Sequence, residues 1–248
     1  MNLAEKKLAE LVRRISERGH LKSIKAEFEA EGTRSDELLR LLDVTRTCNV
    51  PLTLKIGGCE AVKDLYEARQ FGARYIVAPM IESDYALRKF CDTIVKVYPV
   101  EEAAEVDFLF NVETIQAFNF FETIVQVAVE SPVIDGVVFG RTDFSGSLGM
   151  KGDVQNEKVT DCIEAIARRL VATDLDLVVG GAISIASLPE LKRVAQHRLT
   201  RFETRKVVFD GARLSDETLA ESLLDAVHFE ILWLINKSDY YGVLHQED

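Results

Sequence analysis

Prolines, cysteines and long apolar runs are all scarce in this sequence. It has 5 prolines and 4 cysteines in 248 residues. The cysteines are scattered, with no short spacing of the kind that binds a metal, at Cys48, Cys59, Cys91 and Cys162. Such cysteines are typical of reduced thiols, so we expect a cytoplasmic protein. No apolar run approaches the ~20 residues of a membrane-spanning helix, and the first 19 residues lack the apolar block of a signal peptide.

Positive charge is also in short supply. The sequence has 30 lysines and arginines against 41 acidic residues, a net charge of -11. This excess of acid argues against general nucleic-acid binding, because phosphate contacts need clustered lysine and arginine. A small anionic substrate is still compatible with the net negative charge, because a local cluster of basic residues can attract an anion.

The length and composition suit a single domain over residues 1–248. Hydrophobic residues make up 47% of the chain, and an α/β barrel typically takes about 250 residues. Residues 1–19 are expected to form an amphipathic helix, and residues 20–248 a barrel with a C-terminal helix. The apolar residues that follow the helical period in the first segment are Leu8, Leu11, Val12 and Ile15.

Short β-prone runs alternate with helical patterns along the rest of the chain. The β-prone runs are 23–29, 51–57, 74–80, 107–113, 135–141, 176–180 and 206–210. The helical patterns are 34–48, 59–71, 84–97, 114–129, 156–172, 184–197 and 215–237. This alternation predicts parallel strands with right-handed crossovers, and hence an α/β fold of the TIM-barrel type. A closed barrel needs eight strands, so we expect a degenerate first strand near residues 17–22; an irregular barrel is the alternative.

Charged side chains are predicted to face the interior of this barrel. Successive strand residues face opposite ways, and the helix-facing set should be apolar. The alternation then places polar residues inside, among them Lys25, Glu27, Glu29, Thr53, Lys55 and Asn111. Internal ion pairs that simply fill space explain Lys25 and Glu29 equally well.

Two further acids follow successive apolar runs. Glu113 ends the run 107–113, and Asp143 follows the run 135–141. Parallel neighbours would bring both to the same end of the barrel, where such enzymes place their chemistry. Together with Glu27, Glu29, Lys25 and Lys55 they leave a surplus of two carboxylates. Because like charges ~4 Å apart repel by about 4 kcal/mol at a dielectric of ~20, we expect a bound Mg²⁺ or Mn²⁺. Solvated charges at strand ends are the alternative.

The segment after Gly140 reads RTDFSGSLG, which we interpret as a glycine-rich loop. Glycines let backbone N–H groups approach an anion closely, although ordinary turns use the same residues. Its position beside Asp143 makes it a candidate for binding a substrate anion.

Four segments together resemble the HpcH/HpaI aldolase and citrate lyase β-subunit family of pyruvate/phosphoenolpyruvate-type TIM barrels. They read LTLKIGG, YIVAPMIES, FNVETIQA and GVVFGRTDFSGSLG, and the resemblance covers roughly residues 20–210. It implies that Glu113 and Asp143 ligate the metal, that Lys55 replaces a basic residue, usually arginine, beside the enolate oxygen, and that Glu27 matches an acid that holds a metal-bound water. The aldolase branch follows that acid with a histidine, where this chain has Phe28. The general base would then be Glu29, Glu27, a metal-bound water or the substrate.

The resulting hypothesis is a divalent-metal-dependent carbon–carbon lyase. It would act on a 2-keto acid of the pyruvate or oxaloacetate type and an aldehyde through a pyruvate-like enolate. The residues expected to hold the substrate carboxylate are Gly140, Arg141, Thr142 and Ser145.

Two other functions stay open. The first is a 2-hydroxyacyl-CoA lyase, in which His197, Arg198 and Arg201 would meet the CoA phosphates unless they are plain surface charge. The second is an inactive barrel that serves as a binding or scaffold subunit. The apolar segment 219–235 also needs cover from its own barrel or from another subunit, and with the family resemblance it suggests a homo-oligomer.

Overall fold

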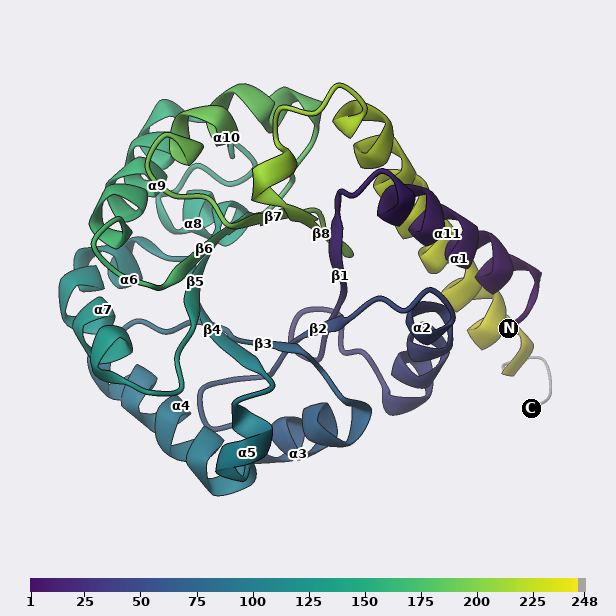
Figure 1. Cartoon of the computed structure of the whole chain (residues 1–248), viewed down its shortest axis with the longest axis horizontal. Helices are drawn as coiled ribbons and strands as arrows, with labels where there is room; N and C mark the ends of the chain where they lie inside the picture. Colours follow the sequence, from purple (N-terminus) through teal and green to yellow (C-terminus); the bar gives the residue numbers. More distant parts are fainter. Residues whose placement is uncertain (245–248) are drawn as a thin grey trace.

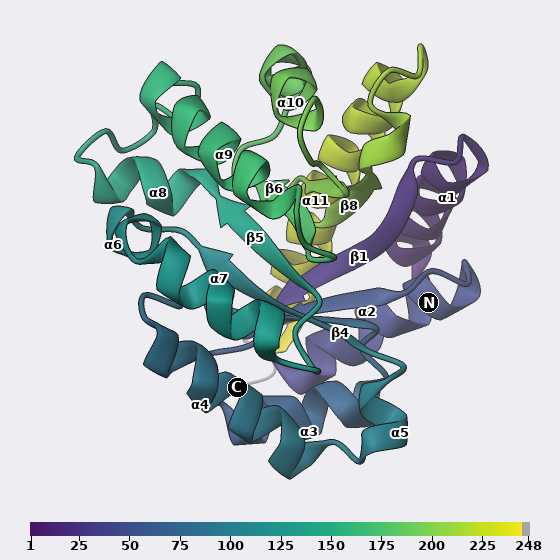
Figure 2. The same cartoon turned by 60° about the vertical axis from the view of Figure 1, so that its left-hand side comes forward.

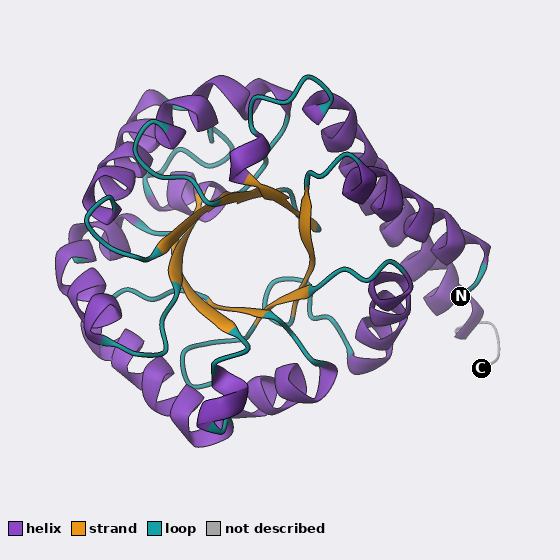
Figure 3. Cartoon of the chain, viewed as in Figure 1, coloured by secondary structure: helices purple, strands orange, loops and turns teal. Residues whose placement is uncertain are grey.

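The structure is a computed structural model that describes the backbone of residues 1–244 and the side chains of residues 1–239. Eight strands close into one barrel, and the helices form a ring around it (Figures 1 and 3). In chain order the strands are β1 (Leu21–Glu27), β2 (Leu52–Lys55), β3 (Tyr75–Ala78), β4 (Asp107–Val112), β5 (Gly136–Gly140), β6 (Asp176–Gly180), β7 (Arg201–Glu203) and β8 (Val207–Asp210). The predicted TIM-type α/β barrel is therefore confirmed.

The helices largely follow the expected alternation. They are α1 (Leu3–Glu17), α2 (Ser35–Thr47), α3 (Val62–Phe71), α4 (Asp84–Val97), α5 (Val100–Ala103), α6 (Ile115–Asn119), α7 (Phe121–Glu130), α8 (Arg141–Ser147), α9 (Glu157–Leu170), α10 (Leu188–Ala195) and α11 (Leu219–Leu244), with 3-10 turns η1 (Ile185–Ser187) and η2 (Gly211–Arg213). The pattern 114–129 is split into α6 and α7, and the expected glycine-rich loop is the short helix α8. None of the helices within residues 1–244 has both the length and the apolar character needed to cross a membrane.

The strand that the sequence pattern failed to show is β7. It pairs in parallel with β6, residues 204–206 then reverse the chain, and β8 runs antiparallel to both β7 and β1. The expectation of a hidden strand near residues 17–22 is wrong, because α1 ends at Glu17 and β1 begins at Leu21. A hairpin without an intervening helix closes the barrel instead.

Helix α1 packs along α11 on the outside of the barrel (Figures 1 and 2). Its first turn is capped by Asn2, whose side chain accepts a hydrogen bond from the backbone N–H of Glu5 at 2.8 Å. Its last turn and the following residue bring Arg14 and Arg18 to the carboxylate of Asp225 on α11. The expected amphipathic N-terminal helix is therefore present.

The barrel interior changes character along its axis. A small apolar cluster lies in its lumen and consists of one residue each from β3 to β6, namely Val77, Leu109, Val138 and Val178. Toward the carboxyl ends of the parallel strands, charged or polar side chains line the lumen, namely Lys25, Glu27, Lys55 and Asn111. At the opposite end, Arg201 pairs with Asp176 at 2.6 Å. The two ends of the lumen thus both carry charge, and the predicted site residues lie at the carboxyl ends of the parallel strands.

Candidate active site

A cavity of about 440 Å³ opens at the carboxyl ends of the parallel strands. Its charged lining residues are Lys25, Glu27, Lys55, Glu113, Asp143, Glu203, Arg205 and Glu230. Of the predicted site residues, six line it, namely Glu27, Lys55, Glu113, Gly140, Thr142 and Asp143. The other three, Glu29, Arg141 and Ser145, are not part of its lining. Another hollow, of about 510 Å³, is lined by residues of the β1–α2 loop, α2 and α3 and contains none of the nine.

Glu113 is the most completely bound of the cavity carboxylates. It follows β4 and is 2% exposed. Its Oε1 accepts the backbone N–H of Met80 at 2.9 Å, and its Oε2 accepts the side-chain amide of Asn111 at 2.6 Å and Lys55 Nζ at 3.1 Å. A Cβ atom at Gly140 would lie 2.9 Å from Glu113 Cβ. The strand-ending glycine on β5 therefore makes room for this side chain.

Lys55 lies between two carboxylates. Its Nζ is 3.1 Å from Glu113 Oε2 and 3.0 Å from Glu29 Oε2. Burial alone would lower the pKa of Lys55, but the charge of Glu113 and the hydrogen bond and charge of Glu29 together raise it above its usual value. Glu29, in the bend after β1, thus acts on the cavity through Lys55.

A second lysine is held in the same way on the other side of the lumen. Lys25 Nζ lies 2.9 Å from Glu27 Oε1 and 2.5 Å from Glu203 Oε1. Burial would lower the pKa of Lys25, yet Glu203 and Glu27 raise it above its usual value. Burial would likewise raise the pKa of Glu27, but Lys25, Lys55 and Lys206 bring it below its usual value.

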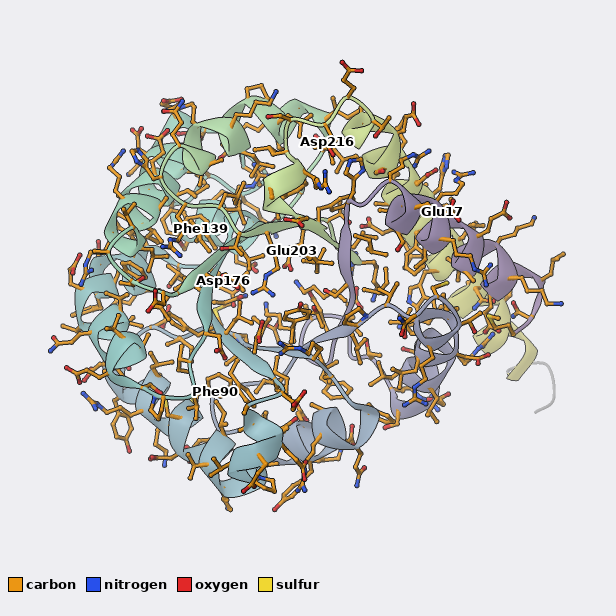
Figure 4. The ribbon with its side chains drawn as sticks, in the orientation of Figure 1. Glu17, Phe90, Phe139, Asp176, Glu203 and Asp216 are labelled. Atoms are coloured by element: carbon orange, nitrogen blue, oxygen red, sulfur yellow. The ribbon has the colours of Figure 1, made fainter. Side chains whose placement is uncertain are left out.

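Glu203 is the functional candidate that sequence reasoning missed. It ends β7, is 3% exposed and lines the cavity. Figure 4 shows it at the inner edge of the strand ring, whereas Phe90 lies outside the ring among the helices. Only the alternation Arg201, Phe202, Glu203 could have indicated it, and three residues are too few to define a strand period.

Helix α8 follows β5 directly (Figure 2), and its residue Asp143 lines the cavity. Asp143 is exposed and forms no hydrogen bond or ion pair with any residue of the described chain. Ser145 Oγ donates to the carbonyl of Thr142 at 2.9 Å, so its hydroxyl is used within the helix.

Arg141 points away from the cavity. It is fully buried and donates to the carbonyl oxygen of Gly181 at 2.7 and 3.0 Å, to Ser187 Oγ at 3.2 Å and to the carboxylate of Glu190. The expectation that the Arg141 and Ser145 side chains reach a substrate is therefore corrected. Both residues shape the segment that bears Asp143.

The oxygen donors of the cavity suit a hard divalent cation that keeps some of its waters. A carboxylate offers about four lone-pair sites, and Glu113 uses three of them, while Asp143 uses none. Asn111 Oδ1 is buried beside Glu113 without a hydrogen-bond partner in the described chain. Among the side chains of residues 1–239, no group of three or more histidine, cysteine or acidic residues is placed so that it could hold a metal ion by itself. One or two carboxylates plus water and substrate oxygens is how Mg²⁺ is usually bound.

Residues 34–188 match the family model described as HpcH/HpaI aldolase/citrate lyase. The chain belongs to this family. As an HpcH/HpaI-type protein, it is indicated to be a lyase of the aldolase or citrate lyase kind. The match contains Lys55, Glu113 and Asp143 but ends before β7, so that Glu203 lies outside it.

Several solved structures of low sequence identity share the fold. An HpcH/HpaI aldolase from Desulfitobacterium hafniense DCB-2 is 20% identical with a TM-score of 0.62, over 79% of this chain and 82% of that one. An HpcH/HpaI aldolase/citrate lyase family protein from Burkholderia cenocepacia J2315 is 13% identical with a TM-score of 0.66, over 100% and 93%. The citrate synthase SbnG is 15% identical with a TM-score of 0.64, over 89% of each chain. A search of curated proteins found no match.

Proposed function

We propose that this protein is a divalent-metal-dependent aldolase that acts on a 2-keto acid of the pyruvate or oxaloacetate type and an aldehyde. Family membership supports lyase chemistry in general. The observation that carries the specific proposal is the convergence of Glu113, from the end of β4, and Asp143, from α8, on one cavity that also contains Lys55. The reaction would pass through a pyruvate-like enolate.

Glu113 and Asp143 are the residues that would hold Mg²⁺ or Mn²⁺. When bound, such an ion supplies positive charge that polarises a keto oxygen and offsets the charge of an enolate. Asp143 has no competing partner among the described residues, and Glu113 has one lone-pair site to offer. The buried hydrogen bonds of Glu113 fix the position of its carboxylate before any ligand arrives.

Lys55 would face the enolate oxygen. Glu113 and Glu29 hold its ammonium group at 3.1 and 3.0 Å and keep it protonated. It is therefore suited to stabilise developing negative charge, the largest contribution in many such reactions, and unsuited to act as an amine nucleophile.

The substrate carboxylate would lie against Gly140 and Thr142, which line the cavity. Gly181 leaves the backbone N–H of Thr142 accessible, because a Cβ atom there would lie 2.7 Å from Thr142 N. Gly181 also has a φ of +89°, which favours glycine.

The test is solvent-deuterium exchange into the methyl group of pyruvate, followed by NMR with Mg²⁺ and again after removal of metal by EDTA. Exchange that requires metal and disappears in Glu113→Gln and Asp143→Asn supports the proposal. The matched control is Asp174→Asn, an exposed acid in the turn between α9 and β6. Full exchange in both active-site variants would refute the assignment of Glu113 and Asp143.

Two of the three bases expected to meet CoA phosphates in the acyl-CoA lyase alternative lie away from the cavity. Arg201 is buried and pairs with Asp176 at the amino end of β6, and Arg198 donates to the carbonyls of Leu175 and Thr173 just before that strand. These two bases therefore lie at the opposite end of the barrel from the cavity and offer no approach for CoA phosphates.

We also propose that the protein forms a homo-oligomer through α11. Five apolar residues at helical spacing are each 42–53% exposed on this helix, namely Leu224, Val227, Ile231, Leu234 and Ile235. Such a stripe is typical of a helix that packs on another surface. Light scattering of the purified protein measures the mass, and Ile231→Lys is expected to lower it to that of one chain. A wild-type mass of 27.8 kDa would refute the proposal.

A further inference from the structure

The proposed aldolase lacks an assigned group for proton transfer, and the cavity contains a carboxylate without an assigned role. Glu203 enters the cavity from the β7–β8 hairpin, outside the part of the chain that matches the family model. The question is whether this carboxylate, unlike the other acids, is free to accept a proton.

The position of Glu203 repeats that of Glu113 on the other side of the lumen. A Cβ atom at Gly180 would lie 2.9 Å from both Cγ and Oε1 of Glu203, as one at Gly140 would lie 2.9 Å from Glu113 Cβ. In each case the glycine that ends a neighbouring strand makes room for a buried acid that accepts a lysine ammonium. Glu113 and Glu203 differ in the hydrogen bonds of the carboxylate oxygen that does not contact the lysine.

That second oxygen is free in Glu203. Its Oε1 accepts Lys25 Nζ at 2.5 Å, and no residue of the described chain donates to its Oε2. In Glu113, by contrast, both oxygens accept hydrogen bonds, from Met80 on one and from Asn111 on the other. Of these two acids, only Glu203 presents an unoccupied carboxylate oxygen to the cavity.

Glu29 and Glu27 are less suited to take up a proton. Glu29 is tied to Lys55 and does not line the cavity. Glu27 lines it, but Lys25, Lys55 and Lys206 all favour its ionised form and lower its pKa. A carboxylate that is strongly held ionised is a weak base.

The cluster of Lys25, Glu27 and Glu203 has a net negative charge that one added proton would neutralise. Lys25 with Glu27 and Glu203 carries one positive and two negative charges. Protonation of one carboxylate brings the group to neutrality and leaves Lys25 paired with the other, so the buried lysine is never without a partner.

We propose that Glu203 is the catalytic acid–base residue of this site, an inference that rests on the proposed aldolase function. Its Oε2 removes a proton from C3 of the bound 2-keto acid. The C–H electron pair becomes the C2–C3 π bond of the enolate, and the carbonyl π pair moves to the oxygen that faces Lys55. In the reverse step the protonated Glu203 returns the proton to C3 and restores the keto acid.

The test compares two reactions that share the enolate but differ in how it forms. Exchange of the pyruvate methyl protons for deuterium requires a base at C3. Decarboxylation of oxaloacetate breaks a C–C bond and leaves its electron pair at C3, so it reaches the same enolate without a base. Both rates are measured with Mg²⁺ above the protein-free background. Glu203→Gln is expected to slow exchange by about 100-fold or more, the usual range for general acid–base catalysis, and to change decarboxylation by less than about 3-fold.

Two further variants keep the result interpretable. Glu203→Asp retains the negative charge that pairs with Lys25, so it should preserve the fold. The shorter side chain moves the carboxylate oxygen away from C3 of the substrate. This variant is therefore expected to slow exchange more than decarboxylation. Glu105→Gln, an exposed glutamate at the opposite end of the barrel, is the matched control and should leave both rates unchanged.

The outcomes separate the two proposals. Unchanged exchange in Glu203→Gln and Glu203→Asp overturns the role of Glu203, and so does an equal loss of both reactions in the aspartate variant. Wild-type protein that decarboxylates oxaloacetate but exchanges no deuterium also overturns it, while the enolate function stands. Wild-type protein that catalyses neither reaction overturns the proposed function and this inference with it.

Discussion

Lys55 Nζ lies 3.1 Å from Glu113 Oε2, and both residues are almost fully buried in the barrel lumen, at 5% and 2% exposure. The pair bridges β2 and the end of β4 across the intervening strand β3. Glu29 approaches Lys55 from the bend after β1. The lysine therefore fixes the candidate ligand Glu113 and shares its charge, which makes it both a structural and an electrostatic element of the cavity.

Replacing Lys55 by methionine is expected to lower the free energy of unfolding by about 3–5 kcal/mol, because it leaves buried carboxylates without their cation. Lys55→Arg retains the charge and should recover most of that stability. Urea denaturation of the three proteins measures the difference. If Lys55→Met is as stable as the wild type, Glu113 and Glu29 do not depend on this pair in solution.

The two candidate metal ligands should differ in their effect on stability. Asp143 is exposed and has no partner among the described residues, so Asp143→Asn is expected to change the unfolding free energy by less than about 0.5 kcal/mol. Glu113→Gln loses a charged acceptor of three buried donors and should cost about 1–3 kcal/mol. Both variants should lose metal-dependent exchange. Thermal or urea unfolding is measured for the wild type and both variants, with and without Mg²⁺. Mg²⁺ is expected to stabilise the wild type and neither variant.

Asp135 makes a pH-dependent contribution at the other end of the barrel. Its Oδ2 accepts the backbone N–H of Phe108 at 2.8 Å. Burial, with the nearby charges of Asp107 and Asp176, raises the pKa of Asp135 to about 6, above the value of about 3.9 in an unfolded chain. A carboxyl group whose pKa rises on folding favours the folded state when protonated, and this contribution is lost as the pH rises from about 4 through 6.

Asp135→Asn should therefore stabilise the protein at about pH 7.5 and not at about pH 4. The expected gain is at most about 1 kcal/mol, because solvent reaches the side chain and screens its charge. Urea denaturation at the two pH values measures the gain, with Asp174→Asn as the control. A gain of equal size at both pH values would show that the charge of Asp135 is not its cause.

Gly181→Ala tests whether the substrate carboxylate binds the backbone N–H of Thr142 on α8. A Cβ atom would lie 2.7 Å from Thr142 N, and the φ of +89° strains any other residue. We expect a loss of stability of about 1–3 kcal/mol and a rise in KM for the 2-keto acid that exceeds the fall in kcat. Gly146→Ala, where a Cβ atom meets nothing within 4 Å, is the control. An unchanged KM in Gly181→Ala would argue against substrate binding at Thr142.

The alternation of side chains was enough to predict the barrel and much of the cavity. Lys55 and Glu113 lie on or next to strands long enough to show their period, and strand ends of a parallel barrel converge by geometry. Glu203 could not be found in this way, because β7 has three residues and no helix separates it from β8. The eighth strand of the barrel was expected before residue 23. It is instead β7, which forms a hairpin with β8 near the other end of the chain.

The direction of individual long side chains was beyond the sequence pattern. Arg141 follows a strand end beside Asp143, and its position alone suggested a substrate contact. Its guanidinium group turns instead toward Glu190, 49 residues farther along the chain. Such a choice depends on tertiary burial and charge pairing, which local spacing does not encode.

The most direct test of the central claim is anomalous diffraction from crystals soaked with Mn²⁺ and oxalate, a stable analogue of the pyruvate enolate. A single Mn²⁺ peak is predicted within direct bonding distance of carboxylate oxygens of both Glu113 and Asp143, about 2.0–2.3 Å, with the oxalate between the ion and Thr142. A peak that contacts neither acid, together with turnover that persists in EDTA, would contradict the claim that these two residues hold the catalytic metal.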